Sequence, residues 1–557
     1  MQGATKLACA LGLALALGSA GDARARDRMA RLPPRGLPPI VFVSRAAPSG
    51  DQAGQVPGLG PHGTFAGAGG KLLEREPDGT LRALVNDGRL FDVADPAISA
   101  NGERVAFAAR ERADGPWRVW TVSRRLASEA RASGESRASG ELFCRTCDDA
   151  PGDDADPAWW GDTLLFVSTR AAPGRLGAAN PAARGALYDG TPVTQLWAIF
   201  PDGGRAVLTH EANGVLDPVA EPDRQRLLFS RWWFNPWRAS AAGGVTRAGA
   251  AERGSAGHVE DLPDSVNLWQ VVSARLVRGV DDALCLDELR LAAGGTVPRR
   301  GGMGVQPAPL PHGGLLAVAA HNMGLAPRPG TLALMRYGAP PSPGQRLAGA
   351  AIGDEPSDPY TEGANLRAPA ACAPAPLPDG RVVCALDPGG HGDFGLWLLD
   401  AKGDGAAPLV DLPGSWELDP APVVIARLTA PVRRAKQQDE DRRIISQPGA
   451  TATFRYQNLD VFLGHGAAPR IDGARLEVYR LFGPDSVGLV RTASLTRLGR
   501  VDLRLPADTP LFELLTDPDG RPLMSAHGPA QVRGFNTGAP NATARCTGCH
   551  LGHSAKP

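Results

Sequence analysis

The 557-residue sequence predicts an all-β protein, a β-propeller of six or seven blades followed by a smaller β-rich domain. The first observation is composition: Gly (69) and Pro (51) are abundant, and aromatic residues make up only 6% of the chain. Such a composition favours many turns and short strands over long helices. The second observation is a repeated segment, in which an Asp-Pro pair is followed by a turn and an apolar strand.

The repeat is clearest at three places, where the Asp-Pro pairs begin at Asp95, Asp156 and Asp217 with a spacing of 61 residues. Weaker copies begin at Gly304, Cys372 and Glu417. A repeat of this size, with about four strands, matches one propeller blade. A single four-stranded sheet cannot bury both of its faces, so the blades are expected to pack around a common axis.

The two ends of the repeat region predict how the propeller closes. "IVFVSR" (Ile40 to Arg45) matches the strand "LLFVSTR" (Leu164 to Arg170) but has no Asp-Pro segment before it. The last copy, near Asp419, has the Asp-Pro pair but a poor strand after it. We therefore expect the N-terminal strand to complete the last blade.

Three boundaries follow from these patterns. We expect the propeller to span residues 35–428, a linker to span 429–450, and a β-rich C-terminal domain to span 451–557. The charged stretch "RRAKQQDEDRRI" lacks apolar periodicity, which is typical of a linker. Alternating apolar residues and a Pro-Asp-Gly turn predict strands beyond it.

A Trp-rich stretch, "SRWWFNPWR" (Ser230 to Arg238), has two interpretations. It could form a binding platform, or it could pack between blades and leave one exposed loop. The second interpretation is preferred, because large aromatic side chains dominate the packing of protein cores.

The N-terminus has the pattern of a signal peptide, predicted for residues 1–25. Lys6 precedes an apolar run from Leu7 to Leu17, and small residues follow, with cleavage expected after Ala20 or Ala25. The run is too short to span a bilayer, and no later stretch is apolar enough for a membrane span. We therefore expect a periplasmic protein. The balance of 59 basic and 59 acidic residues gives no support for a nucleic-acid partner.

The chain ends in "RCTGCHLGHSAKP", in which Cys546, Cys549 and His550 form a Cys-x-x-Cys-His motif. This motif is the attachment signature of a c-type haem. Two cysteines three residues apart can reach the two vinyl groups, and the following imidazole can reach the iron. One covalent haem c is the expected cofactor. The alternatives are a zinc site, which would need two further ligands such as His553 and His527, and a simple disulfide turn.

The second axial ligand of the iron has three candidates, Met524, His527 and His553. His553 follows His550 by three residues, so it would lie on the same side of a helical turn and is poorly placed to reach the opposite haem face. His527 is therefore the predicted ligand. Met would raise the reduction potential, a second His would lower it, and an open position would allow substrate chemistry.

The other cysteines are expected to have structural roles. Cys144 and Cys147 are followed by Asp148 rather than His, and they could pair as a disulfide, as could Cys372 and Cys384. Cys285 would then be buried and free.

Taken together, these motifs resemble the alpha-subunit family of hydrazine synthase. The repeats look like TolB-type propeller repeats, and they precede "RLPADTPLFELLTDPDGRPL" and the Cys-x-Gly-Cys-His motif. The stretches "LTHEANGVLDPVAEPD" and "LDPGGHGDFGLWLLDAKG" also look like that group, so the resemblance covers most of residues 35 to 553. It implies a propeller followed by a haem-bearing segment.

The sequence departs from this family in two respects. The family enzyme continues into a further haem domain, whereas this sequence stops at Pro557. The family's equivalent haem uses a Tyr after the motif as iron ligand, and no Tyr follows Cys549 here. His550 is thus the expected ligand. We expect an exported c-type cytochrome acting in periplasmic electron transfer or partner binding. The alternative is a haem redox enzyme acting on small nitrogen or oxygen compounds.

Overall fold

All elements that the described residues form are strands, as the all-β prediction requires. The computed structural model describes residues 36–47, 69–85, 88–124, 141–148, 151–170, 193–209, 211, 213–221, 226–247, 267–278, 284–293, 303–311, 314–320, 331–335, 370–389, 392–400, 405–425, 453–462, 469–483, 486–507, 509–525, 528–532, 534–536 and 543–546. The predicted signal peptide and the predicted linker lie outside these ranges. Within them, no helix is long and apolar enough to cross a membrane.

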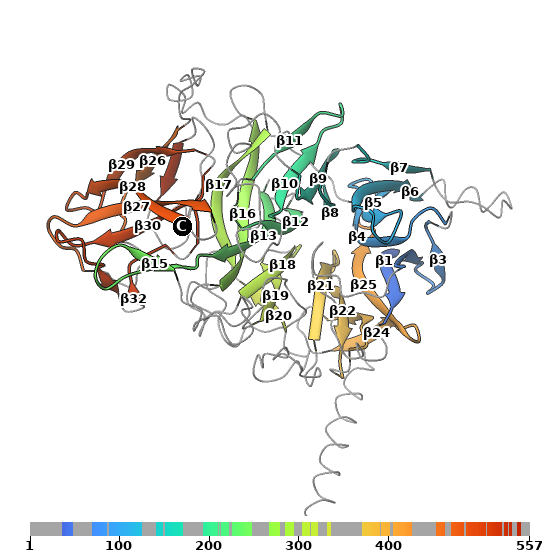
Figure 1. The fold of residues 1–557 in the computed structure, drawn as a ribbon. Helices are drawn as coiled ribbons and strands as arrows, with labels where there is room; N and C mark the ends of the chain where they lie inside the picture. Colours follow the sequence, from blue (N-terminus) through green and yellow to red (C-terminus); the bar gives the residue numbers. More distant parts are fainter. Residues whose placement is uncertain are drawn as a thin grey trace, which may run out of the picture.

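The described residues of the propeller region form six sheets around a common axis, and each has an inner strand that carries the repeated motif. These inner strands are β4 (Asp92–Ile98), β8 (Asp154–Trp160), β12 (Val215–Glu221), β18 (Met303–Pro309), β21 (Ala370–Pro376) and β25 (Ser415–Pro422). Each inner strand contacts the next one, and β25 contacts β4, so the inner strands form a closed circle. This circle is the arrangement of a β-propeller, which occupies the centre and right of Figure 1.

The remaining propeller strands pair outward from the inner ones in antiparallel order. Beside β4 lie β5 (Arg104–Arg110), β6 (Arg118–Ser123) and β7 (Leu142–Cys144); beside β8 lie β9 (Thr163–Ser168), β10 (Gln195–Ile199) and β11 (Arg205–Val207); beside β12 lie β13 (Arg226–Phe234), β16 (Asn267–Arg278) and β17 (Leu284–Ala293); beside β18 lie β19 (Leu315–Ala320) and β20 (Thr331–Met335); and beside β21 lie β22 (Val382–Asp387), β23 (Gly395–Leu399) and β24 (Ala406–Val410).

The sixth sheet joins the two ends of the propeller. Its inner strand β25 pairs with β1 (Ile40–Ala46), β1 pairs with β2 (Lys71–Arg75), and β2 pairs with β3 (Leu81–Ala83). Ile40 stands opposite Pro422, and Ala46 stands opposite Ser415. The prediction that the N-terminal strand completes the last sheet is therefore confirmed. This pairing joins residues about 370 to 380 positions apart in one ladder and closes the circle of sheets.

The C-terminal domain, at the left of Figure 1, contains two three-stranded sheets and a short hairpin. One sheet has the order β29 (Val501–Pro506), β26 (Thr453–Asn458) and β33 (Thr543–Cys546). The other has the order β28 (Ser486–Ser494), β27 (Arg475–Gly483) and β30 (Leu511–Thr516), and the hairpin consists of β31 (Met524–Ser525) and β32 (Gly528–Pro529). Along β26, Phe454, Tyr456 and Asn458 are buried and alternate with partly exposed residues, which is the pattern of a half-buried strand.

The Trp-rich stretch joins the propeller to this domain. Trp232 stacks on Trp269 within the propeller core, with ring centroids 6.1 Å apart. Trp233 and Trp237 instead belong to the hydrophobic core of the C-terminal domain. The stretch therefore packs partly inside the propeller, as the preferred interpretation held, and partly against the second domain, which that interpretation did not foresee.

Hydrogen bonds fix the same junction. The hairpin of β14 (Trp237–Ala239) and β15 (Val245–Arg247) extends from β13 towards the C-terminal domain. Gln531 Nε2 donates to the Trp237 carbonyl at 2.7 Å, and the Ala239 N–H donates to Gln531 Oε1 at 2.7 Å. One side chain of the domain thus holds the backbone of the hairpin at two points.

The disulfide that the sequence allowed between Cys372 and Cys384 is not present, because both residues are buried free cysteines. The register gives the reason. Cys372 stands opposite Ala385, not opposite Cys384. Successive side chains along a strand point to opposite faces of the sheet, so this register does not place the two thiols directly opposite each other. Cys285 lies on β17, and its side chain is outside the described residues.

Candidate functional site

The predicted attachment segment begins at the end of strand β33. Cys546 is the last residue of β33, and it stands opposite Asn458, the last residue of the parallel strand β26. Cys549, His550 and His527 lie outside the described residues, as does the side chain of Cys546. The structure thus places one anchor of the motif, at the end of the sheet β29-β26-β33.

The chain around Asn458 is held by local hydrogen bonds. Asn458 is buried, and its Nδ2 donates to the Tyr456 hydroxyl at 3.1 Å. Its Oδ1 accepts the Asp460 N–H at 3.1 Å, which closes an Asx turn directly after the strand. The residue inside this turn, Leu459, is 51% exposed. An apolar side chain therefore lies in solvent next to the strand that ends at Cys546.

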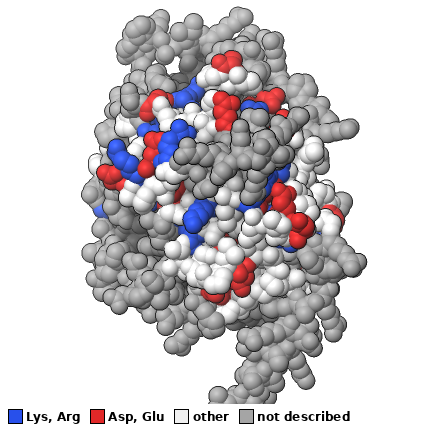
Figure 2. All heavy atoms as spheres, turned by 90° about the vertical axis from the view of Figure 1, so that its right-hand side faces the viewer, with Lys and Arg blue, Asp and Glu red and all other residues white. Residues whose placement is uncertain are grey.

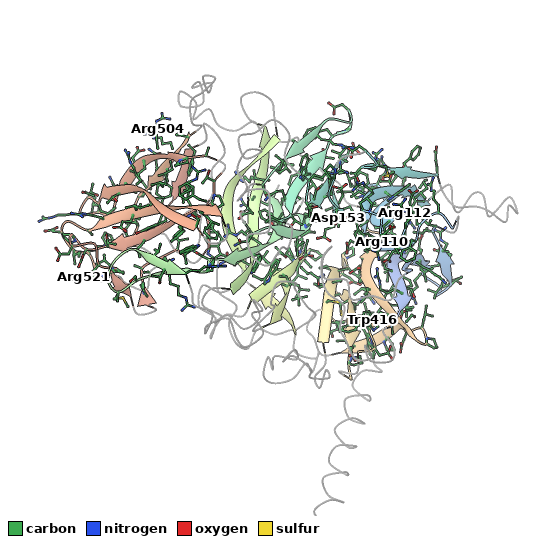
Figure 3. All side chains as sticks on the ribbon, in the orientation of Figure 1. Arg110, Arg112, Asp153, Trp416, Arg504 and Arg521 are labelled. Atoms are coloured by element: carbon green, nitrogen blue, oxygen red, sulfur yellow. A yellow bond between two sulfur atoms is a disulfide. The ribbon has the colours of Figure 1, made fainter. Side chains whose placement is uncertain are left out.

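Of the three second-ligand candidates, Met524 and His527 belong to the β31–β32 segment, and His553 lies outside the described residues. His527 lies between β31 and β32, and Met524 on β31 is 57% exposed. Figure 3 shows Arg504, on β29, at the upper edge of the domain. Arg521, three residues before β31 begins, lies at its lower edge. The hairpin and the β33 sheet are separate in the strand pairing.

The other Cys-x-x-Cys pair is a disulfide. Cys144 and Cys147 are bonded to each other, one of the arrangements that the sequence allowed, and their Cα atoms are 5.5 Å apart. Their thiols are therefore not available for thioether bonds. Within the described residues, no group of three or more His, Cys, Asp or Glu side chains is arranged to hold a metal ion.

A ring of side chains on the propeller axis was missed as a site by sequence reasoning. Each inner strand has one residue with positive φ before a proline, and the φ values lie between 44° and 52°. The six residues are Asp95, Asp156, Asp217, Gln306, Ala373 and Asp419. They are the Asp-Pro positions of the repeat and their weaker copies, so the 61-residue spacing was the available signal.

Hydrogen bonds link these residues from one inner strand to the next. The Asp217 N–H donates to Asp156 Oδ2 at 3.1 Å, the Gln306 N–H to Asp217 Oδ2 at 3.1 Å, and the Ala373 N–H to Gln306 Oε1 at 2.6 Å. The Asp156 and Asp95 N–H groups donate in the same way to the carboxylates of Asp95 and Asp419. The positive φ therefore orients the backbone so that a side-chain oxygen on one inner strand accepts the N–H of the equivalent residue on the next inner strand. Ala373 is the one member without a side-chain acceptor.

Burial of four carboxyl groups in one ring changes their titration. Desolvation, with the charge of neighbouring ring members, raises the pKa of Asp156 to about 7, of Asp419 to about 7 and of Asp217 to about 6. The pKa of Asp95 is also raised, first by desolvation and then by the charge of Asp156. Arg45 opposes the rise at Asp95 and Asp419. The ring thus holds protons at pH values where an exposed aspartate is ionised.

A second buried acid lies in the C-terminal domain. Glu513 on β30 is buried, and desolvation raises its pKa to about 8. Asn536 Nδ2 lies 2.9 Å from Glu513 Oε1 and 2.7 Å from Oε2. Among the described residues, Asn536 Oδ1 has no hydrogen-bond partner. A protonated Glu513 could donate to this oxygen if the amide turned over, so the pair suits a neutral acid.

These features define the class of the protein: a β-propeller that carries a second β domain on one side. No family model matches the chain, and no curated protein matches it. Among solved structures, the chain is similar to the one titled Kuenenia stuttgartiensis hydrazine synthase, with a TM-score of 0.58 and 15% identity over 92% of this chain and 69% of that chain. It also matches TolB from Acinetobacter baumannii, with a TM-score of 0.37 and 10% identity over 69% of this chain and 66% of that one.

Proposed function

We propose that the protein is an exported c-type haem protein in which a six-bladed propeller supports a haem-bearing β domain. Cys546 and Cys549 would form the two thioether bonds, and His550 would ligate the iron. The Cys-x-x-Cys-His motif at the end of β33 carries this proposal. When bound, the haem supplies one-electron redox chemistry or an open iron position.

The described structure supports the proposal in three ways. The motif starts where a parallel ladder ends, so the backbone of its first residue is fixed by pairing with β26. The surface beside it exposes leucine side chains, which suits an apolar macrocycle. The six sheets with a closed circle of inner strands support the blade count.

The packing of the C-terminal domain against the propeller is consistent with the role that we propose. Trp233 and Trp237, from the propeller, pack in the hydrophobic core of this domain, so the propeller supports the domain that ends in the motif. We propose electron transfer or partner binding in the periplasm, with a redox partner protein. On the propeller face shown in Figure 2, acidic and basic side chains are intermixed, which does not suggest a nucleic-acid surface there.

The experiment that tests this function is a mass measurement of the chain exported in cells that attach haem c. We expect a gain of one haem, and we expect the Cys546→Ala/Cys549→Ala variant to lose it. The matched control is Cys144→Ala/Cys147→Ala, which removes the disulfide and should keep the haem. A mass equal to that of the haem-free chain would overturn the proposal, and zinc found in that protein would favour the zinc alternative.

The structural similarity to hydrazine synthase favours a second candidate, a haem redox enzyme acting on small nitrogen or oxygen compounds. The two candidates differ at the second axial position. An electron-transfer protein would have this position filled, for which we propose His527, and its reduced spectrum should not change with carbon monoxide. An enzyme would have an open position and bind carbon monoxide readily. His527→Ala should convert the first behaviour into the second.

A further inference from the structure

The Cys144–Cys147 disulfide closes a short, exposed loop at the edge of a propeller sheet. Cys144 ends β7, the outermost strand of the sheet β4-β5-β6-β7, and Cys147 follows after two residues. Cys147 is exposed, and Phe143, directly before Cys144, is 50% exposed. A reagent in solution can therefore reach the disulfide from the side of Cys147.

A purely structural role explains this disulfide poorly. In the chain-entropy account, a disulfide stabilises a protein by closing a loop in the unfolded chain, and long loops gain the most. Only two residues separate these cysteines, so this contribution is close to its minimum.

Hydrogen bonds hold the loop in place without help from the disulfide. The Arg145 N–H donates to the Val119 carbonyl at 2.8 Å, and the Val119 N–H donates to Thr146 Oγ1 at 2.9 Å. Thr146 is buried, and its carbonyl accepts Arg170 Nη2 at 2.6 Å. The two cysteines would therefore stay close after reduction, and the bond could form again with little loss of chain entropy.

Two arginine side chains from other parts of the propeller are bonded to the loop. Arg205 Nη2 donates to the Arg145 carbonyl at 2.9 Å, and Arg205 also pairs with the Asp148 carboxylate. Arg170 pairs with the same carboxylate. The Arg205 guanidinium thus spans the segment from Arg145 to Asp148, in which Cys147 lies.

The charged groups around the loop are mainly positive. Among the described residues, they are Arg145, Arg170 and Arg205 against Asp148 in the loop or bonded to it, and Arg118 against Asp154 behind them. Positive charge near a cysteine favours its thiolate, which is the form that reacts in thiol–disulfide exchange. An exposed cysteine in such surroundings is typical of a reactive cysteine rather than an inert one.

We propose that the Cys144–Cys147 disulfide is a thiol–disulfide exchange site that oxidises a dithiol, either a small molecule or a protein. One thiolate of the partner attacks the exposed Cys147 sulfur, forms a mixed disulfide and releases Cys144 as a thiolate, which takes up a proton. The second partner thiolate then attacks the partner sulfur of the mixed disulfide and releases Cys147. The partner loses two electrons and two protons, and the two cysteines gain them as thiols. This activity does not depend on haem, so its failure would leave the proposed function intact.

The first test is reduction of the folded, full-length protein by dithiothreitol and, in a second arm, by reduced thioredoxin. Alkylation followed by mass measurement of each peptide reports Cys144 and Cys147 separately from the other cysteines. We expect both thiols to appear while the far-ultraviolet circular dichroism stays that of the folded protein. Reduction by both reagents supports a protein partner, and reduction by dithiothreitol alone assigns the site to small dithiols. A disulfide that is reduced only after urea unfolds the propeller would overturn the proposal.

The second test measures how fast iodoacetamide alkylates Cys147 in the reduced protein as the pH is varied. We expect a midpoint below the ordinary thiol value of about 8.5. Arg205→Gln should raise this midpoint and Asp148→Asn should lower it, each by up to about one pH unit, because they remove opposite charges at the loop. The control is Arg112→Gln, at a side chain that is 75% exposed and pairs with Asp114, and it should match the wild type. Equal midpoints in all four proteins would contradict activation of Cys147 by the arginines and overturn the proposal.

Discussion

At the scale of single residues, the ring on the propeller axis contains one residue, Ala373, that lacks a hydrogen-bond acceptor, and the fold tolerates it. Five members of the ring offer an oxygen to the next strand, whereas Ala373 offers a methyl group. Ala373 nevertheless has a φ of 49°, a left-handed conformation that costs a residue with a Cβ about 1 to 2 kcal/mol. Asp and Asn adopt this conformation more readily. The alanine therefore has the backbone strain of the motif but offers no side-chain acceptor to the next inner strand.

We predict that Ala373→Asn stabilises the protein by about 1 kcal/mol, because asparagine tolerates the left-handed conformation and supplies the missing acceptor. The measurement is the free energy of unfolding in urea. The reverse change, Gln306→Ala, removes the acceptor of the Ala373 N–H and should destabilise by about 1 to 2 kcal/mol. An Ala373→Asn variant less stable than the wild type would show that the ring hydrogen bonds do not govern stability here.

At the scale of elements, the junction between the propeller and the C-terminal domain depends on a close approach of backbone to ring. Gly534 packs against Trp233, and a Cβ added there would lie 2.1 Å from Trp233 Cδ2. Trp233 is also covered by Arg231, whose guanidinium lies 4.1 Å from the ring centroid. The indole is thus held between the two domains, and only glycine fits beside it.

We predict that Gly534→Ala destabilises the docked domain by about 1 to 3 kcal/mol, the usual cost of overpacking, or more if the domains separate. Calorimetry should show an earlier transition for the C-terminal domain, and tryptophan fluorescence should shift to the red as Trp233 becomes solvated. Gly115→Ala, in a propeller turn where the nearest atom is 3.3 Å away, is the control. Unchanged fluorescence and melting in Gly534→Ala would contradict this account of the junction.

At the scale of the whole molecule, the closed circle gathers acids that are far apart in sequence. Asp95, Asp156, Asp217 and Asp419 come from four different sheets, and the circle of inner strands brings them to one axis. Their raised pKa values mean that the folded protein holds protons more tightly than the unfolded chain does. By linkage, this contribution to stability is complete below about pH 4 and is lost as the pH rises through about 6 to 7.

We predict that Asp156→Asn reduces the loss of folding stability that occurs as the pH rises. The amide keeps an acceptor for the Asp217 N–H and cannot ionise, so the variant should be more stable than the wild type at pH 8, by on the order of 1 to 4 kcal/mol. At pH 4 the two should be similar. Urea unfolding at both pH values is the measurement, and Asp162→Asn, at a side chain that is 84% exposed, is the control. Equal stability of variant and wild type at pH 8 would contradict the proposed protonation of the ring.

The sequence predicted the repeat, the all-β class and the closing role of Ile40 to Arg45. It also allowed the Cys144–Cys147 disulfide without deciding it. Each depends on local information: turn residues at a fixed spacing, alternation along a strand, or two cysteines within one turn. The Cys-x-x-Cys-His motif is also local, so the sequence predicts its chemistry while the structure supplies the position of Cys546 opposite Asn458.

Only the tertiary structure decided which residues meet across long distances. The ring needs six strands at one axis, the docking of Trp233 on Gly534 joins residues about 300 positions apart, and the separation of Cys372 from Cys384 depends on the register of one strand pair. A local pattern states that a strand forms and which face is apolar. It does not state which other strand covers that face, because that choice depends on the packing energy of the whole chain.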